Sequence, residues 1–237
     1  MTELILARRL PLLIVAAVAV MPAVAGGQVC AGSAPFARGP VQVSGGASFN
    51  QHARAFGAGL AIGGAGAFGQ VGLGTLQADG LEGSAFTVGG AAGAEVSIYR
   101  ARTVTICPII SLASASGASL DYYGDGQLVR DVTLTDVAVS MGIGVVASRS
   151  QRAQVVAAGS LSFVYGITRL TNPDPTVSYV PEYSTQSGSS WLAGLSIGFG
   201  FSDAVMLHVN TAIPIGVAGA SATIGTGLSF NFGKKRR

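Results

Sequence analysis

The last alternating stretch of the chain, Ala220 to Phe232, reads A-S-A-T-I-G-T-G-L-S-F-N-F. Its even-numbered positions are mostly apolar and end in Phe230 and Phe232, whereas its odd-numbered positions are small or polar. This period of two is typical of a β-strand, because successive side chains of a strand point to opposite faces. The last, seam-closing strand of a transmembrane β-barrel needs such faces, one for lipid and one for the lumen. The stretch therefore predicts a barrel.

The composition of the whole chain supports a membrane protein without membrane-spanning helices. The 237 residues include 35 glycines and only 11% charged residues, whereas soluble domains carry about 25%. A helix that crosses a bilayer needs roughly 18 or more consecutive apolar residues, and the sequence after residue 25 contains no such run. Because a bilayer admits only helices and closed barrels, we predict an all-β fold, a closed antiparallel up-and-down transmembrane β-barrel.

The one continuous apolar run, Leu10 to Ala25, predicts a secretory signal peptide. Arg8 and Arg9 precede this run, which ends in the small residues A-V-A. A basic start, an apolar centre and an A-x-A end are the parts of a cleavable signal, so residues 1–25 are expected to be removed. A membrane anchor is the alternative, disfavoured because the run is short. Residues 26–37 are then a periplasmic lead-in to the barrel.

Beyond the lead-in, the alternation recurs in ten segments. Bacterial single-chain barrels have even strand numbers, and eight strands is the alternative count. With roughly 10 to 14 residues and a tilt of about 40°, each segment can cross an apolar band of about 25 Å. The predicted barrel occupies residues 38–232, and a basic tail follows at 233–237. The predicted strands are 40–50, 54–63, 67–76, 85–98, 103–116, 132–147, 153–167, 190–201, 204–213 and 220–232.

The lengths of the connections predict which end of the barrel faces outward. Barrels of this type have short periplasmic turns and longer extracellular loops, with both termini in the periplasm. With a periplasmic N-terminus, the two long connections, 117–131 and 168–189, fall outside. Acidic residues, Asp136 among them, then gather at the outer end, and basic residues gather at the inner end. The net charge is only +3, so no nucleic-acid partner is indicated.

Side-chain parity predicts a lipid-facing surface that is bounded by two aromatic girdles. The parity changes between Leu134 and Val137, which predicts a β-bulge near Asp136. The outward aromatic residues are Phe49, Phe56, Phe86, Tyr165 and Trp191 at the outer end, and Tyr99, Phe201, Phe230 and Phe232 at the inner end.

The signal peptide, the alternating segments and the closing L-S-F-N-F resemble those of small bacterial outer-membrane proteins, the OmpA/OmpX-type "outer membrane protein beta-barrel" domains. The resemblance covers residues 38–232 as a pattern. It implies a place in a Gram-negative-type outer membrane, with periplasmic termini and contacts to lipid and lipopolysaccharide. It also implies that the assembly machinery recognises the last strand. Residues 233–237, G-K-K-R-R, depart from the terminal aromatic residue with which such barrels usually end.

The two cysteines, Cys30 and Cys107, would meet an oxidising periplasm after export. Cys30 lies in the lead-in, and Cys107 lies near the inner end of a predicted strand, on its lumen-facing parity. A disulfide that joins the lead-in to the mouth of the barrel is therefore predicted, with two free thiols as the alternative. Closing such a long loop would contribute about 4 kcal/mol to stability.

Barrel enzymes are an alternative that the residues do not favour. A lipid A deacylase needs a histidine and a serine together at the lipid face, but His208 has lumen-facing parity. An omptin-like protease needs carboxylates and a histidine above the membrane at the outer rim, and the predicted strands are too short to raise them there. The candidates for such a site would be His52, Asp121, Asp125 and Asp131. We expect no enzyme activity and no cofactor.

The remaining candidate residues lie in the lumen and in the outer loops. The loop sequence D-Y-Y-G-D-G at 121–126 lacks the later glutamate of an EF-hand, so no metal site is expected. The predicted lumen-facing polar residues are Glu95, His208 and Asn210, and the predicted extracellular contact residues are Asp121, Tyr122, Tyr123, Asp125, Tyr179 and Tyr183.

The expected function is structural or surface-interacting, through envelope integrity or adhesion-like contacts of the outer loops, and the expected state is a monomer. The alternative is a porin-like, narrow passive pore for small or hydrophobic solutes, since ten strands leave a narrow bore.

Overall fold

The computed structural model describes residues 29–31, 40–64, 66–98, 104–121, 129–149, 154–171, 183–202, 204–217 and 219–232. Within these ranges, the side chains at 121, 129, 130, 147–149 and 183 are not described. The predicted signal peptide (1–25) and basic tail (233–237) lie outside the described residues, as does most of the lead-in. No helix in the described ranges is long and apolar enough to cross a membrane.

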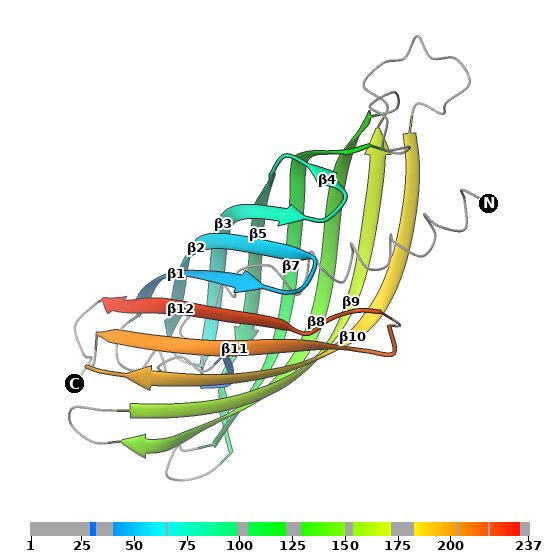
Figure 1. Ribbon diagram of the computed structural model, residues 1–237. Coiled ribbons are helices and arrows are strands. Elements are labelled where there is room, and N and C mark those ends of the chain that lie inside the picture. Colours follow the sequence, from blue (N-terminus) through cyan, green and yellow to red (C-terminus); the bar gives the residue numbers. More distant parts are fainter. Residues whose placement is uncertain are drawn as a thin grey trace.

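Ten strands form a closed antiparallel barrel in which each strand pairs with the next and the last pairs with the first (Figure 1). This confirms the predicted fold class. The seam between first and last strand runs in unbroken register from the pair Val41–Phe232 to the pair Phe49–Ile224. The ten strands are β1 (Val41–Phe49), β2 (Ala53–Gly64), β3 (Ala67–Ala78), β5 (Ala85–Ala94), β7 (Val104–Asp121), β8 (Val129–Arg149), β9 (Gln154–Thr171), β10 (Tyr183–Gly200), β11 (Val205–Ile215) and β12 (Thr223–Phe232). Two short strands, β4 (Leu81–Glu82) and β6 (Val96–Ser97), pair with β7.

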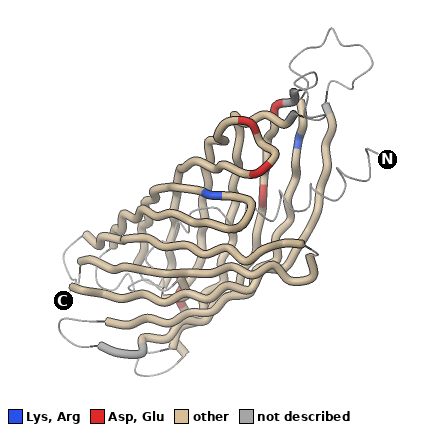
Figure 2. Tube along the Cα trace, in the orientation of Figure 1, with Lys and Arg blue, Asp and Glu red and all other residues tan. Residues whose placement is uncertain are grey.

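The two ends of the barrel differ. We call the end where β1 begins and β12 ends the terminal end. We call the opposite end, which holds the connections at 50–52, 79–84, 122–128, 172–182 and 216–222, the loop end. Figure 2 shows that most of the charged residues drawn in colour lie toward the loop end.

The apolar face of the sheet points outward, and the small, polar face points into the lumen. On β12, Thr223 and Ser229 are buried, whereas Ile224 and Phe230 are 60% and 42% exposed. The same alternation runs through the other barrel strands. An outer surface of this kind requires an apolar surrounding, which a bilayer supplies.

Aromatic side chains gather on the outer surface near both ends of the strands, as the parity predicted. At the loop end, Phe49 packs edge-to-face on Phe56 with ring centroids 5.8 Å apart. Phe163 packs in the same way on Trp191 at 5.2 Å. The exposed aromatics at the terminal end are Phe201, Phe230 and Phe232, whereas Tyr99 lies outside the described residues. The positions are those of the two aromatic girdles of membrane barrels.

Four neighbouring strands are longer than predicted. β7, β8, β9 and β10 have 18, 21, 18 and 18 residues, and they extend past the other strands at the loop end (Figure 1). We call this extension the protruding sheet, formed by residues 116–121, 129–136, 166–171 and 183–190. Its exposed outward residues are mostly polar, among them Ser116, Asp131, Arg169, Thr185 and Ser187. The predicted strands end too early because the alternation of apolar residues ends where the protruding sheet begins. The argument that the strands are too short to rise above a membrane is therefore wrong.

The predicted bulge near Asp136 is also wrong. The register of β7 against β8 shifts between Ala115 and Ala118, so the extra residue is on β7. Gly117 lies there with φ of 92°, a backbone conformation that glycine adopts at such bulges. Leu134 is 2% exposed and points into the lumen, so β8 keeps one parity past Asp136. Leu134 had been assigned to the lipid face because it is apolar.

We predict that a charge is tolerated on the outward face of β10 only in the protruding sheet. Leu195→Arg places a charge on a side chain that is 59% exposed, about midway between the girdles, and should lower the free energy of unfolding by about 2 to 4 kcal/mol. Thr185→Arg, on the same face, should cost less than about 1 kcal/mol. Urea unfolding in lipid vesicles, followed by the fluorescence of the single tryptophan, Trp191, measures both. Equal losses would contradict the placement of the membrane.

Candidate functional site

The lumen of the barrel has three layers, and the inner face of β8 crosses all of them. Nearest the terminal end is a short 3-10 helix, η1 (Val29–Ala31). A cavity follows, and an apolar cluster on the inner faces of β2, β3, β5, β7, β8 and β9 lies nearer the loop end. Along β8, Gly144 and Gly142 face η1, Ser140, Ala138 and Asp136 line the cavity, and Leu134 and Val132 belong to the apolar cluster.

The helix η1 is covalently attached to the wall of the barrel. Cys30 forms a disulfide with Cys107 of β7, with their Cα atoms 6.1 Å apart, which confirms the predicted pairing. Cys30 is 5% exposed and Cys107 is fully buried. The bond spans 77 positions of sequence and fixes η1 within the lumen.

Further contacts hold η1 against the lumen wall. The Val29 amide donates a hydrogen bond to Glu95 Oε1 at 3.3 Å. At the other end of η1, Ser196 Oγ donates to the Ala31 carbonyl at 2.9 Å. The side chain of Val29 is buried in one cluster with Val156 and Met206. The helix is therefore held by polar contacts at both ends and by apolar packing between them.

Two glycines of β8 make room for η1. A Cβ atom at Gly142 would lie 2.8 Å from Cys30 Cβ, and one at Gly144 would overlap the Val29 carbonyl. No larger residue fits at these positions while η1 is in place. The sequence analysis did not predict this role. The available signal was the M-G-I-G-V stretch, which puts two glycines on the lumen parity of one strand.

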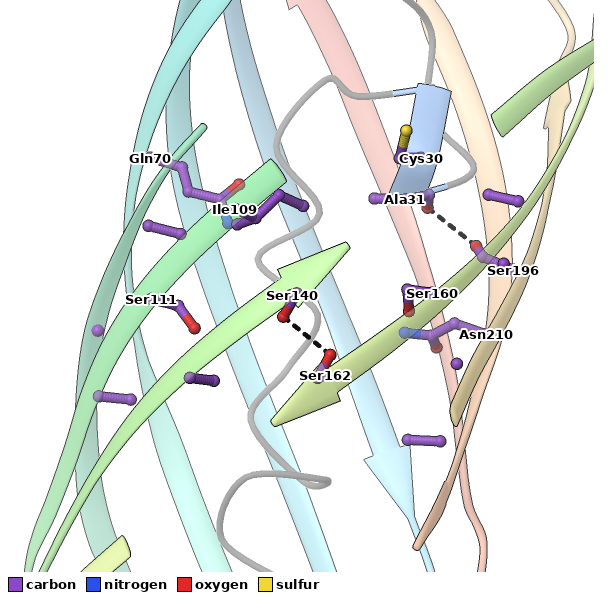
Figure 3. Close-up of a pocket in the computed structure, with 18 of the residues that line it drawn as sticks. Cys30, Ala31, Gln70, Ile109, Ser111, Ser140, Ser160, Ser162, Ser196 and Asn210 are labelled. Carbon is purple, nitrogen blue, oxygen red and sulfur yellow. Dashed lines mark hydrogen bonds between the residues drawn. The ribbon is translucent and has the colours of Figure 1, made fainter. Parts of the chain in front are cut away.

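A cavity of about 300 Å³ lies in the lumen against η1, with Cys30 and Ala31 in its lining (Figure 3). Its surface is mostly apolar and is formed largely by small side chains, with hydroxyl and amide groups among them. Ser140 Oγ donates a hydrogen bond to Ser162 Oγ at 2.8 Å across neighbouring strands. The polar lining residues are Gln70, Ser111, Asp136, Ser140, Ser160, Ser162, Ser196, Asn210 and Thr211. Asp136, assigned to the acidic outer end from the sequence, is thus a lumen residue, 4% exposed.

The apolar cluster near the loop end was not predicted. Alanines and leucines make up most of this layer. The residues of this cluster lie on strands whose outward side chains become polar in the protruding sheet. Hydrophobicity alone therefore did not indicate which side chains point into the lumen. The cluster consists of Ala53, Ala55, Leu76, Ala85, Ala115, Ala118, Leu120, Val132, Leu134 and Leu170.

The structure places the predicted lumen residues at different depths. Glu95 follows β5 and contacts η1. His208 of β11 is 3% exposed, and its Nδ1 atom has no hydrogen-bond partner in the described part of the chain. Asn210, two residues along β11, lines the cavity.

The structure places few of the predicted outer contact residues. Asp121 ends β7 and Tyr183 begins β10, so both belong to strands, but their side chains are not described. Tyr122, Tyr123, Asp125 and Tyr179 lie outside the described residues. Elsewhere at the loop end, His52 Nδ1 is 3.1 Å from Asp79 Oδ2 on the exposed surface. Among the described residues, no group of three or more His, Cys, Asp or Glu could hold a metal ion.

The chain matches no known family model, and no curated protein sequence matches it. Among solved structures, it is similar to the translocator domain of the autotransporter NalP from Neisseria meningitidis, with 10% identity and a TM-score of 0.46 over 81% of this chain and 88% of that one. It is also similar to Ail, the attachment invasion locus protein of Yersinia pestis, with 13% identity and a TM-score of 0.41 over 82% of this chain and 99% of that one. The KdgM porin matches with 6% identity and a TM-score of 0.38 over 81% of this chain and 99% of that one. These scores are too low to carry an argument about function.

We predict that the disulfide stabilises the folded barrel. Cys107→Ser should lower the free energy of unfolding by about 4 kcal/mol, because the unfolded chain is no longer closed into a loop. The double variant Cys30→Ser/Cys107→Ser should lose no more than the single variant, since both remove the same bond. Chemical denaturation, with and without reductant, measures this. A double variant as stable as the oxidised wild type would refute the prediction.

Proposed function

We propose that this chain is an outer-membrane β-barrel of a Gram-negative-type envelope that makes surface contacts through its protruding sheet. The proposal rests on one observation: the same barrel has a filled lumen and a sheet that extends past the aromatic girdle. Solute transport would use the interior of the barrel, whereas surface contact uses the part that rises above the membrane.

The filling of the lumen argues against an open pore. At the terminal end, a path along the axis meets η1, which the disulfide and two polar contacts hold in place. At the loop end, it meets a cluster whose leucine side chains are almost completely buried, such as Leu76, Leu134 and Leu170. Water and ions do not pass readily between packed apolar side chains. The described residues thus narrow the lumen at two levels, at η1 and at the apolar cluster.

The protruding sheet offers two features that suit a protein partner. Its outward face is polar, with exposed Thr185, Ser187 and Ser189 on β10. Residues 183–190 of β10 pair with β9 on one side, and in the described part of the chain no strand pairs with their other side. Such an edge presents backbone N–H and C=O groups to which an extended segment of another protein can add as a further strand.

The remaining assignments extend the same proposal. The termini are periplasmic, the outer surface contacts lipid and lipopolysaccharide, the assembly machinery recognises β12, and the barrel is a monomer. Catalysis is not part of the proposal. His52 lies in the exposed connection after β1 and His208 lies buried in β11, so the two described histidines do not share a site.

Cell adhesion tests the role of the protruding sheet. Escherichia coli cells that express the full chain should be retained on plates coated with fibronectin, laminin or collagen, or should aggregate with one another. A variant in which residues 117–132 and 167–186 are each replaced by a short turn should return both readouts to the level of cells without the protein. Heat-modifiable migration on gels verifies that the shortened barrel is folded. Equal retention and aggregation of the two strains would overturn the proposal.

Conductance in planar bilayers tests the alternative of a narrow pore. We expect the oxidised wild-type protein to give a flat current trace, because η1 and the apolar cluster fill the lumen. The variant Cys30→Ser/Gly144→Val removes the disulfide and the space for Val29. The difference between its current and that of the wild type measures how much η1 contributes to closing the lumen. Stepwise currents from the wild type would establish the pore and refute the closed lumen.

A further inference from the structure

A carboxylate without a partner is buried in the wall of the lumenal cavity. Asp136 is 4% exposed, and neither of its carboxylate oxygens has a hydrogen-bond partner within the described residues. It points inward from β8 and lines the cavity. Burying an unpaired, ionised carboxylate is strongly unfavourable, and a positively charged group placed beside it would offset that cost.

Among the described residues that line the cavity, Asp136 is the one charged side chain. In the sheet, Asp136 lies beside Ala113 of β7 and Gly166 of β9. Two further buried hydroxyls on the same inner surface, Thr168 of β9 and Ser190 of β10, have no hydrogen-bond partner in the described ranges. The arginines whose side chains are described, at 54 and 169, are exposed on the outward face. The described side chains therefore leave the carboxylate of Asp136 uncompensated.

The size of the cavity indicates what could compensate it. A volume of about 300 Å³ equals that of roughly ten water molecules at about 30 Å³ each, which is too large for a bare metal ion. It is at the lower end of the range for small-molecule sites. Hydroxyl and amide residues from six strands, such as Ser111, Ser162 and Asn210, line the same space. They can bind hydroxyl groups of a ligand while Asp136 binds a cation.

We propose that this cavity binds a small organic cation, a primary amine that carries hydroxyl groups. The ammonium group pairs with the carboxylate of Asp136, and the hydroxyls hydrogen-bond to the serine and asparagine side chains of the opposite wall. The floor of the site is η1, through Cys30 and Ala31. This site is independent of the surface contacts proposed above, so a result that refutes one proposal leaves the other standing.

Isothermal titration calorimetry of the purified full-length protein in detergent tests the site with paired probes. Ethanolamine and glucosamine carry the amine, and ethylene glycol and glucose are their neutral counterparts. At least one amine should bind the wild type, and its neutral counterpart should not. Asp136→Asn should weaken binding about ten- to hundred-fold, the usual worth of a hydrogen bond to a charged group. Asp131→Asn, at an exposed carboxylate of the same strand, should leave the affinity unchanged.

A second variant tests whether binding needs the space of the cavity as well as the charge of Asp136. Ala138→Leu keeps Asp136 but fills the cavity beside it, so it should also abolish binding. Heat-modifiable migration shows which variants are folded, and either variant that folds suffices for the test. The proposal is overturned if neither amine binds, if neutral and charged probes bind alike, or if potassium ions occupy the site with the same dependence on Asp136 while the amines do not.

Discussion

The closed ladder of backbone hydrogen bonds is the constraint on which the rest of this structure depends. Lipid offers no partner to an N–H or C=O group, so every such group between the two girdles must be paired within the sheet. The pairing of β1 with β12 completes the ladder. Once the ladder is closed, the period of two assigns apolar side chains to the lipid and leaves the smaller ones to fill a narrow interior.

The interior is filled in layers because the inward residues change in kind along the strands. Two glycines of β8 make room for η1, small polar residues surround the cavity, and leucines pack the layer near the loop end. The apolar cluster and the protruding sheet share strands, since β7, β8 and β9 contribute residues to both. The apolar cluster therefore packs against the base of the protruding sheet.

The sequence predicted the barrel, its ten strands, the girdles and the disulfide because each of these leaves a mark in the alternation or in the position of a residue along a strand. It did not predict the full length of β7 to β10, because polar outward residues such as Thr185 and Ser187 remove the apolar signal. It misplaced the bulge because Leu134 is apolar and inward, and hydrophobicity does not distinguish a packed lumen from lipid. Asp136 was misplaced for a related reason, since a charge near a strand end suggests a surface.

The buried disulfide has a consequence for the order in which this protein assembles. Cys107 is fully buried and Cys30 nearly so, so an oxidising enzyme cannot reach either sulfur once η1 is seated. Oxidation must therefore begin while the start of the chain is still outside the lumen or the wall is still incomplete. The covalent link then holds an N-terminal segment against a central strand and closes a ring of chain that contains β1 to β6.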